Sequence, residues 1–413
     1  MKDVKNILNY TIDNNVRLQE DGKMPVAICL EAEAGIGKTS VVEQVAKERN
    51  MTYVKLSLHE LDEVGDLLGW PQMEYECQVA KKVKDKDGNV KLQILPGTTW
   101  LNTKQLENKD NAMAFKQTGK TRMSYAKPAW VPEYNENGIL LNLDDFGRCN
   151  QALSQAIMSL ILTQSYTSWK LPQKTSIFLT SNPDNGVYTI NTQDVAQKDR
   201  FLTFPLVFDR DAWATWAEKN NIDGRCINFV MSYADELFNV DDQGNRICTP
   251  RSFVMFADMI SGIKDWDNPE NLSFIQTIAQ GCFKDEGNKF ASMFGSFIRN
   301  KMHQLIQPKE MLTGDWNRIQ QKLEDTLYSN EEWRADIAAL LERRFSNYVN
   351  AWLESGDKTP IDKVKKRILN FMDNPKRLFN RDMYYHMLKA ITTEHRRQTS
   401  ALLYEPKFAE ILK

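Results

Sequence analysis

The fold is decided by residues 24–39, which read MPVAICLEAEAGIGKT. Residues 24–32 form a short apolar run rich in strand formers, which is typical of a buried strand in a parallel sheet. The segment after Gly37 has the composition of a helix through Arg49. The same rhythm continues with expected strands at residues 52–58, 138–145 and 175–182 and a helix at 150–164. Strands that alternate with helices predict an α/β domain built on a parallel sheet.

The turn between this strand and helix has the features of a loop that binds phosphate groups. Gly35 and Gly37 let the backbone N–H groups curl toward anionic oxygens without a clash at Cβ, and the following helix N-terminus adds partial positive charge. Lys38 would reach the β- and γ-phosphates of a nucleotide, and Thr39 would hold Mg²⁺. A chance glycine-rich turn is the alternative. The residues expected at the phosphate site are Glu33, Ala34, Gly35, Ile36, Gly37, Lys38, Thr39 and Ser40.

Polar side chains end the two later strands. Asp144 and Asp145 close the run ILLNLDD, and Asn182 follows TSIFLTS. Ligands bind at the carboxyl edge of open α/β sheets, so Asp144 would hold Mg²⁺ through water and Asp145 would orient or deprotonate the attacking water. The neutral amide of Asn182 would hydrogen-bond the γ-phosphate or that water. The alternatives are acids that end a strand at a turn and a turn Asn before Pro183.

Two arginines complete the set of expected catalytic residues. Arg200, near the edge of the domain, would reach the nucleotide of a neighbouring subunit and offset charge in phosphoryl transfer. Lys198 and Arg210 are rival candidates, and a surface ion pair between Arg200 and Asp199 is the alternative. Arg251 lies in the first turn of a helix, where acids are usual, and would contact the γ-phosphate from a lid. An ordinary surface arginine is the alternative there.

The chain is expected to divide into a nucleotide-binding core at residues 1–208, a helical lid at 209–268 and a helical C-terminal domain at 269–413. An insertion at about 73–130 interrupts the core, and its alternation around Asp87–Gly88 predicts a β-hairpin.

Further along, Ser329 and Glu332 have the spacing of a capping box. They predict a helix that begins just ahead of Trp333.

Composition bounds the class of protein. Of the 413 residues, 42% are hydrophobic and 26% charged, as in a soluble globular protein rather than a disordered or fibrous one. No run is long enough to span a bilayer, and the N-terminus lacks the continuous apolar stretch of a signal peptide, so we expect a cytoplasmic protein. The six cysteines form no C-x-x-C pair, which gives no indication of a zinc site or a disulfide framework. The net charge of −2 argues against indiscriminate nucleic-acid binding.

At these residues the sequence resembles the AAA+ ATPases, and within them the MoxR-like group of bacteria and phages. The segments that carry the resemblance are GDLLGWPQ at 65–72, the stretch from Ala126 through the acidic strand to Tyr166, SNPDN, DRFLTFPLVFD and TPRSF, and they cover roughly residues 1–265. The resemblance implies ATP and Mg²⁺, a hexameric ring, an arginine finger at Arg200 and a lid arginine at Arg251. It also implies a remodelling role on a protein client, frequently with a von Willebrand A-domain partner.

The sequence departs from the pattern of this group at three positions. Asp145 stands where Glu is usual, and its side chain is one methylene shorter. Ala32 and Ala34 replace the commoner Gly and Pro. Hydrolysis is therefore expected to be slow if the shorter carboxylate holds the water poorly.

Three functions remain open from the sequence. The leading hypothesis is a ring-forming ATPase that remodels a protein assembly. The second is a nucleic-acid motor of the same class, because residues from Asn271 onward carry 23 Lys and Arg against 18 Asp and Glu. The third is a scaffold that binds ATP to hold a ring and scarcely turns it over, which the substitution at Asp145 keeps open.

Overall fold

The computed structural model describes residues 2–84, 90–107, 113–184, 199–240, 246–329, 331–355 and 361–412. The chain splits into two compact units. One comprises Lys2–Glu33 and Gly37–Leu206 and is called the α/β unit. The other comprises Val207–Lys413 with Ala34–Ile36 and is called the helical unit.

The α/β unit is built on a five-stranded parallel sheet with the order β10-β1-β9-β6-β2. The strands are β1 (Ala27–Glu31), β2 (Thr52–Ser57), β6 (Ile139–Asp144), β9 (Thr175–Ser181) and β10 (Phe201–Pro205). The first four confirm the predicted strands, and β10 was not predicted. Because β9 lies between β1 and β6, the strand that ends in Asp144 is separated from the phosphate-loop strand by one strand.

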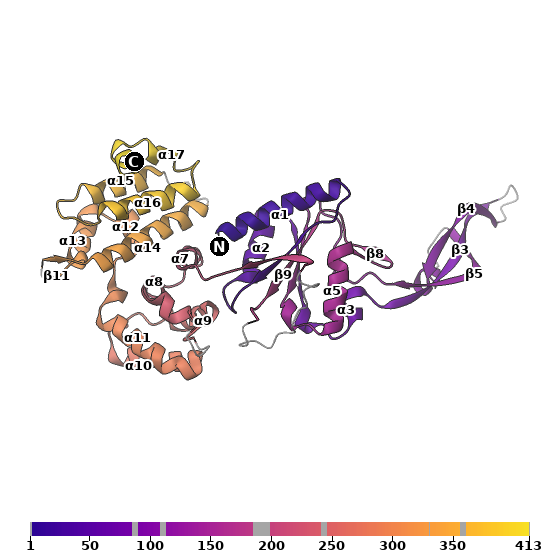
Figure 1. Ribbon diagram of the computed structural model, residues 1–413, viewed down its shortest axis with the longest axis horizontal. Helices are drawn as coiled ribbons and strands as arrows, with labels where there is room; N and C mark the ends of the chain where they lie inside the picture. Colours follow the sequence, from indigo (N-terminus) through magenta and orange to yellow (C-terminus); the bar gives the residue numbers. More distant parts are fainter. Residues whose placement is uncertain are drawn as a thin grey trace. The chain divides into compact units, whose positions relative to one another are not determined.

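Helices cover both faces of this sheet (Figure 1). They are α1 (Lys2–Glu20), α2 (Lys38–Glu48) and α5 (Gln151–Thr163), of which α2 and α5 are close to the predicted ranges. Side chains alternate along each strand, so Leu141 and Leu143 of β6 join a buried cluster with α5. Asn142 and Asp144 face the other side, where the first turn of α2 reaches Asp144 through Thr39.

Short elements connect the strands of the α/β unit. They are η1 (Leu58–Glu60), α3 (Val64–Leu68), η2 (Phe146–Arg148) and the small antiparallel pair β7 (Ser165–Tyr166) and β8 (Trp169–Lys170). The indole of Trp169 donates to the carbonyl of Leu68 at 2.9 Å, and the indole of Trp130 donates to that of Leu67 at 3.0 Å. These bonds anchor the returning chain against α3.

The predicted insertion is a three-stranded antiparallel sheet with the order β4-β3-β5. Its strands are β3 (Pro71–Lys84), β4 (Val90–Asn102) and β5 (Met113–Tyr125), with the short helix α4 (Thr103–Glu107) after β4. Figure 1 shows the three strands extending away from the parallel sheet. The pairing of Lys84 with Val90 confirms the hairpin, whereas its predicted turn at Asp87–Gly88 lies outside the described residues.

The helical unit contains α7 (Arg210–Lys219), α8 (Gly224–Phe238), α9 (Pro250–Ile260), α10 (Pro269–Phe283), α11 (Gly287–Arg299), α12 (Pro308–Thr313), α13 (Trp316–Leu327), α14 (Ala335–Glu354), α15 (Ile361–Met372), α16 (Arg381–Glu394), α17 (Ser400–Leu403) and α18 (Pro406–Ile411), with short turns η3 (Lys284–Glu286) and η4 (Met302–Gln304). One buried apolar cluster extends from Trp213 to Phe408. The α/β architecture predicted from the sequence, a parallel sheet with an antiparallel insertion followed by helices, is therefore confirmed. Within the described ranges, no helix is both long and apolar enough to cross a bilayer.

The predicted capping box at Ser329 and Glu332 is wrong. Tyr328–Ser329 (β11) and Glu332–Trp333 (β12) form a small antiparallel ladder, and α14 begins only at Ala335 with Arg334 as its N-cap. The backbone N–H of Arg334 donates to the carbonyl of Leu327 at 2.7 Å, which closes this turn between the two helices. Ladder pairing therefore takes the place of the cap that the spacing suggested.

Candidate functional site

The turn after β1 has the backbone of an anion-binding loop. Gly35 and Gly37 have φ of +82° and +100°, which residues with a Cβ adopt only with strain. Gly37 is the N-cap of α2, and the first turn of that helix contains no acidic residue. The N–H groups of this first turn and the helix dipole therefore favour an anion at this end. Ala32 and Ala34 do not have positive φ, so neither position requires glycine.

Lys38 is the first residue of α2, and it is buried. Its Nζ donates to the carbonyl oxygens of Ala32 at 2.6 Å and Glu33 at 3.2 Å, and to Oδ1 of Asn182 at 2.7 Å. The ammonium group is therefore held at the carboxyl ends of β1 and β9. Two residues predicted to act on one phosphate group, Lys38 and Asn182, are in direct contact.

Asp144 lies at the end of β6, and both of its carboxylate oxygens have partners. The hydroxyls of Thr39 (2.8 Å) and Thr180 donate to Oδ1, and Nζ of Lys55 lies 3.0 Å from Oδ2. Burial alone would raise the pKa of Asp144, but the hydrogen bonds from Thr180 and Thr39 and the charge of Lys55 outweigh it, and its pKa lies below the usual value. Asp144 is therefore a carboxylate at neutral pH.

The sheet register explains this convergence. Leu143 of β6 is opposite Leu179 of β9, so Asp144 comes beside Thr180, and Ser57 of β2 is opposite Asp144. Because all five strands are parallel, the carboxyl ends of β1, β9 and β6 meet at one edge of the sheet. The two residues predicted to bind Mg²⁺, Thr39 and Asp144, are thus brought within hydrogen-bonding distance.

Asp145 adopts a left-handed backbone conformation with φ of 58° and ψ of 41°. Asp tolerates this conformation better than most residues because its short side chain can bond locally. Its N–H donates to Oγ1 of Thr180 at 3.2 Å, and its Oδ2 lies 3.9 Å from Nδ1 of His59, which follows β2. Thr180 therefore contacts both acids, because it accepts from one and donates to the other.

Arg200 lies at the opposite edge of the sheet from Lys38. It immediately precedes β10, which runs parallel to β1 with Phe201 opposite Ala27 and Pro205 opposite Glu31. At about 3.3 Å per residue, the two ends of such a strand are roughly 13 Å apart. Arg200 is therefore far from the phosphate loop of its own chain.

The two other candidate arginines, Arg251 and Arg210, lie in the helical unit. Arg251 is exposed in the first turn of α9, which Thr249 caps through a hydrogen bond from the N–H of Ser252. Arg210 begins α7 and donates to the carbonyl of Met231 at 3.3 Å. Lys198, the other rival for the role of Arg200, lies outside the described residues.

Three residues near Asp144 and Asp145 were not predicted from the sequence, namely Lys55, His59 and Thr180. Thr180 lies in the strand that contributes Asn182, two residues earlier and therefore on the same face of the sheet. A search for polar residues at even spacing before the strand end would have found it. Lys55 and His59 lie near the two acids only because β2 is the neighbour of β6, and the sequence motifs do not predict that strand order.

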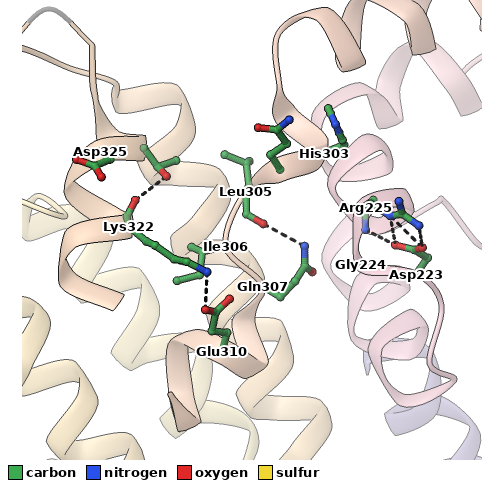
Figure 2. Close-up of a pocket in the computed structure, with 12 residues that line it drawn as sticks. Asp223, Gly224, Arg225, His303, Leu305, Ile306, Gln307, Glu310, Lys322 and Asp325 are labelled. Atoms are coloured by element: carbon green, nitrogen blue, oxygen red, sulfur yellow. Dashed lines mark hydrogen bonds and ion pairs between the residues drawn. The ribbon is translucent and has the colours of Figure 1, made fainter. Parts of the chain in front are cut away.

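A separate cavity of about 540 Å³ lies in the helical unit and contains none of the predicted site residues (Figure 2). Its charged side chains are largely matched to one another. Arg225 holds Asp223 at 2.7 Å, and Lys322 reaches Glu310 at 2.6 Å. This internal pairing leaves little net charge to recognise a charged ligand, and we do not assign the chemistry to this cavity.

No protein-family model and no curated protein matches the chain. Among solved structures, the RuvB Holliday junction branch migration motor of Thermotoga maritima is similar at 14% identity and a TM-score of 0.35, over 70% of this chain and 71% of that chain. A single-residue variant of the same protein gives 14% identity and a TM-score of 0.34, over 89% and 94% of the two chains. Similarities this low do not define the function. The class that the chain's own fold and site define is an α/β protein with a parallel sheet and, at its carboxyl edge, a glycine turn, a buried lysine and a threonine–aspartate pair.

Proposed function

We propose that this chain is an ATP-binding and ATP-hydrolysing subunit of the AAA+ class, MoxR-like, that works as a ring and remodels a protein assembly. One observation carries the proposal. Lys38 and Thr39, at the start of α2, contact Asn182 and Asp144 at the ends of two other strands. Residues from three separate segments thus converge at the edge of the sheet where ligands bind.

The residues present fit Mg²⁺ and a nucleotide. Mg²⁺ prefers oxygen ligands, and the adjacent oxygens of Thr39 and Asp144 are a hydroxyl and an ionised carboxylate. When bound, Mg²⁺ would offset the negative charge that develops on the phosphate oxygens. The N–H groups of residues 33–40 and the dipole of α2 supply the positive potential that phosphates need.

Each remaining side chain has a role that its position supports. Lys38 would exchange its carbonyl partners for phosphate oxygens, since an ammonium group has three donors that can be redirected. Asp145 would orient the attacking water or accept its proton. Asn182 would hydrogen-bond the γ-phosphate or the same water without adding a negative charge.

Steady-state release of phosphate from ATP tests this proposal. Lys38→Ala should abolish turnover, because it removes the cation at the carboxyl ends of β1 and β9. Lys47→Ala is the matched control, since Lys47 lies on the same helix, is largely exposed and pairs with Glu43 at 3.0 Å. Equal turnover in the Lys38→Ala and Lys47→Ala variants would refute the assignment.

The position of Arg200 supports a role in a neighbouring subunit. Since it lies at the amino edge of the sheet, it would act on a nucleotide held by another copy of the chain, where it would speed phosphoryl transfer by about 10³–10⁵. Rings mixed from Arg200→Ala and Lys38→Ala subunits test this. Some interfaces in such rings combine an intact Lys38 with an intact Arg200 from the neighbour, so mixing should restore turnover that neither variant has alone. Failure to restore it in assembled mixed rings would mean that Arg200 does not act in trans.

The other parts of the proposal follow from the resemblance. Arg251 would contact the γ-phosphate from a lid at residues 209–268, and residues 269–413 would form a further helical domain. The ring would be a hexamer in the cytoplasm, with a protein client and a von Willebrand A-domain partner. The mass of the particle with ATP present tests the ring, and a mass of one chain at all concentrations would contradict it.

A nucleic-acid motor is the second candidate, and the charge of the insertion favours it. Residues 71–125 carry ten Lys and Arg against six Asp and Glu, in a chain whose net charge is −2. DNA binding through these cations should weaken steeply with salt. The exposed Lys104 and Lys116 provide the test, because each replacement by Glu should reduce the salt slope by about 1 if that lysine contacts a phosphate. A flat salt dependence would exclude this function.

The third candidate is a nucleotide-gated scaffold with little turnover. The side chain of Asp145 favours it, since a carboxylate one methylene shorter than that of Glu reaches less far toward an attacking water. Tight ATP binding without phosphate release would select the scaffold. Multiple turnovers per subunit would exclude it.

A further inference from the structure

Lys55 is a charged residue at the candidate site. It belongs to none of the sequence motifs, and it has no role in the proposed reaction. It lies on β2, opposite Asn142 of β6, on the same face of the sheet as Asp144. Its Nζ is 3.0 Å from Oδ2 of Asp144. The side chain of Lys55 is 44% exposed, whereas that of Asp144 is 12% exposed. The pair therefore joins a fixed carboxylate to a cation that can turn into solvent.

Both oxygens of the Asp144 carboxylate have a donor within the protein. Oδ1 accepts from Thr39 and Thr180, and Oδ2 faces Lys55. The hydroxyl of Thr39 can rotate and keep its place beside an incoming cation, because a hydroxyl oxygen both donates and accepts. Lys55 cannot do so, because an ammonium group has no acceptor and carries the same sign of charge as a metal ion. A divalent cation at Asp144 must therefore displace Lys55 or lie against it.

The other cations near this edge do not occupy the same position. Lys38 directs its Nζ to the carbonyls of Ala32 and Glu33 and to the amide oxygen of Asn182. The ring of His59 lies beside Asp145, at 3.9 Å from its Oδ2. Lys55, by contrast, forms an ion pair with Asp144, the carboxylate proposed to hold Mg²⁺.

We propose that Lys55 is a built-in competitor of Mg²⁺: it neutralises Asp144 while the site is without metal and must swing into solvent before the divalent cation can bind. This inference rests on the proposed function, because it assigns a role at the same Mg²⁺ site. Lys55 thereby sets the concentration of free Mg²⁺ at which the nucleotide complex forms. The partial exposure of the Lys55 side chain keeps the cost of the swing small, since exposed ion pairs contribute little.

The size of the effect follows from the exposure of the pair. An ion pair with one exposed partner changes an equilibrium constant by up to about fivefold. Removing the competing charge should therefore lower the half-saturating concentration of Mg²⁺ by about three- to fivefold. Lys55→Met removes the charge and keeps the apolar stem, whereas Lys55→Arg keeps a cation. Lys55→Gln is a second neutral variant, in case the methionine disturbs the fold.

The experiment measures binding rather than turnover. The affinity for a fluorescent, non-hydrolysable ATP analogue is titrated with Mg²⁺, and the affinity without metal is measured in EDTA. Paramagnetic resonance of Mn²⁺ with nucleotide-free protein gives a second readout that needs no nucleotide. Lys47→Met is the matched control, because it removes an exposed lysine of α2 that pairs with Glu43 rather than with Asp144.

The expected result is a three- to fivefold lower half-saturating Mg²⁺ and tighter Mn²⁺ binding for Lys55→Met and Lys55→Gln, with Lys55→Arg and Lys47→Met close to wild type. An unchanged or raised half-saturating Mg²⁺ in both neutral variants, with nucleotide binding intact, would overturn the role of Lys55 alone. If the wild-type chain bound no nucleotide at any Mg²⁺ concentration, the proposed function would fail, and the inference that rests on it would fail too.

Discussion

Replacing Asp144 by Asn removes one negative charge from the edge of the sheet with little change of shape. Hydrogen bonds to a charged acceptor contribute about 1 kcal/mol more than bonds to a neutral one, so the donations from Thr39 and Thr180 lose about 2 kcal/mol together. The pair with Lys55 adds at most about 1 kcal/mol, because the lysine is half-exposed. A neutral amide is easier to bury, which offsets about 1 kcal/mol. The expected net cost is about 1–2 kcal/mol.

The pH dependence of this cost has a definite sign. The pKa of Asp144 in the folded chain lies below its usual value, because the threonine hydrogen bonds and Lys55 outweigh burial. A depressed pKa stabilises the fold above the unfolded value, and this contribution is lost as the pH falls through the folded value. The difference between wild type and Asp144→Asn should therefore be constant from pH 5 upward and shrink below about pH 4.

Hydrogen exchange measured by mass spectrometry is the suitable assay, because the two units need not unfold together. Peptides from β6 and β9 should exchange about 5–30 times faster in the variant at pH 7. Glu133→Gln is the control, since its carboxylate pairs with Lys127 at 3.2 Å but is 93% exposed, and it should change little. Protection equal to wild type in Asp144→Asn at pH 7 would refute the reasoning.

Three further substitutions test separate parts of the structure. Gly37→Ala should destabilise the start of α2 by about 1–2 kcal/mol, because φ is +100°, and unchanged exchange of α2 would contradict this. Asp145→Glu should not raise the rate of phosphate release, since the left-handed backbone at this position suits Asp better than Glu; a clearly faster variant would show that length matters more than backbone. Arg344→Met should cost about 3–5 kcal/mol in thermal unfolding of the helical unit, because it leaves the carboxylate of Glu218 without its buried partner at 2.7 Å, and an unshifted transition would exclude this ion pair as a stabilising contact.

The sequence predicted the elements around the phosphate loop well because local patterns determine them. The apolar run before Gly35 became β1, and the run that ends in Asp144 became β6. The run TSIFLTS before Asn182 became β9, which pairs with β6. Buried parallel strands are short continuous apolar runs, and their length and flanking glycines distinguish them from helices.

What the sequence did not predict depends on pairing between distant segments. β10 was missed because FLTFP is short and mixed in exposure and ends in Pro205. The contacts of Lys55 and His59 with the two acids arise only because β2 lies next to β6. The order of strands is set by packing of the whole unit, and no local motif states it.

The wrong prediction of a capping box has a different cause, because one local spacing fits two structures. Ser329 and Glu332 have the right spacing, but that spacing also suits a tight antiparallel turn. Local propensity could not choose between the two, and the cross-strand pair of Tyr328 with Trp333 belongs to the turn. As a result, α14 begins at Ala335, after the turn.

The central claim is that the turn at residues 33–40 holds the phosphates of a nucleotide whose Mg²⁺ lies at Thr39 and Asp144. Isothermal titration calorimetry of the intact chain with ATP, with and without Mg²⁺, measures this most directly. We expect saturable binding near one ATP per chain, tighter with Mg²⁺, lost in Lys38→Ala and kept in Lys47→Ala. No heat of binding from the folded wild-type chain, or equal binding by Lys38→Ala, would contradict it.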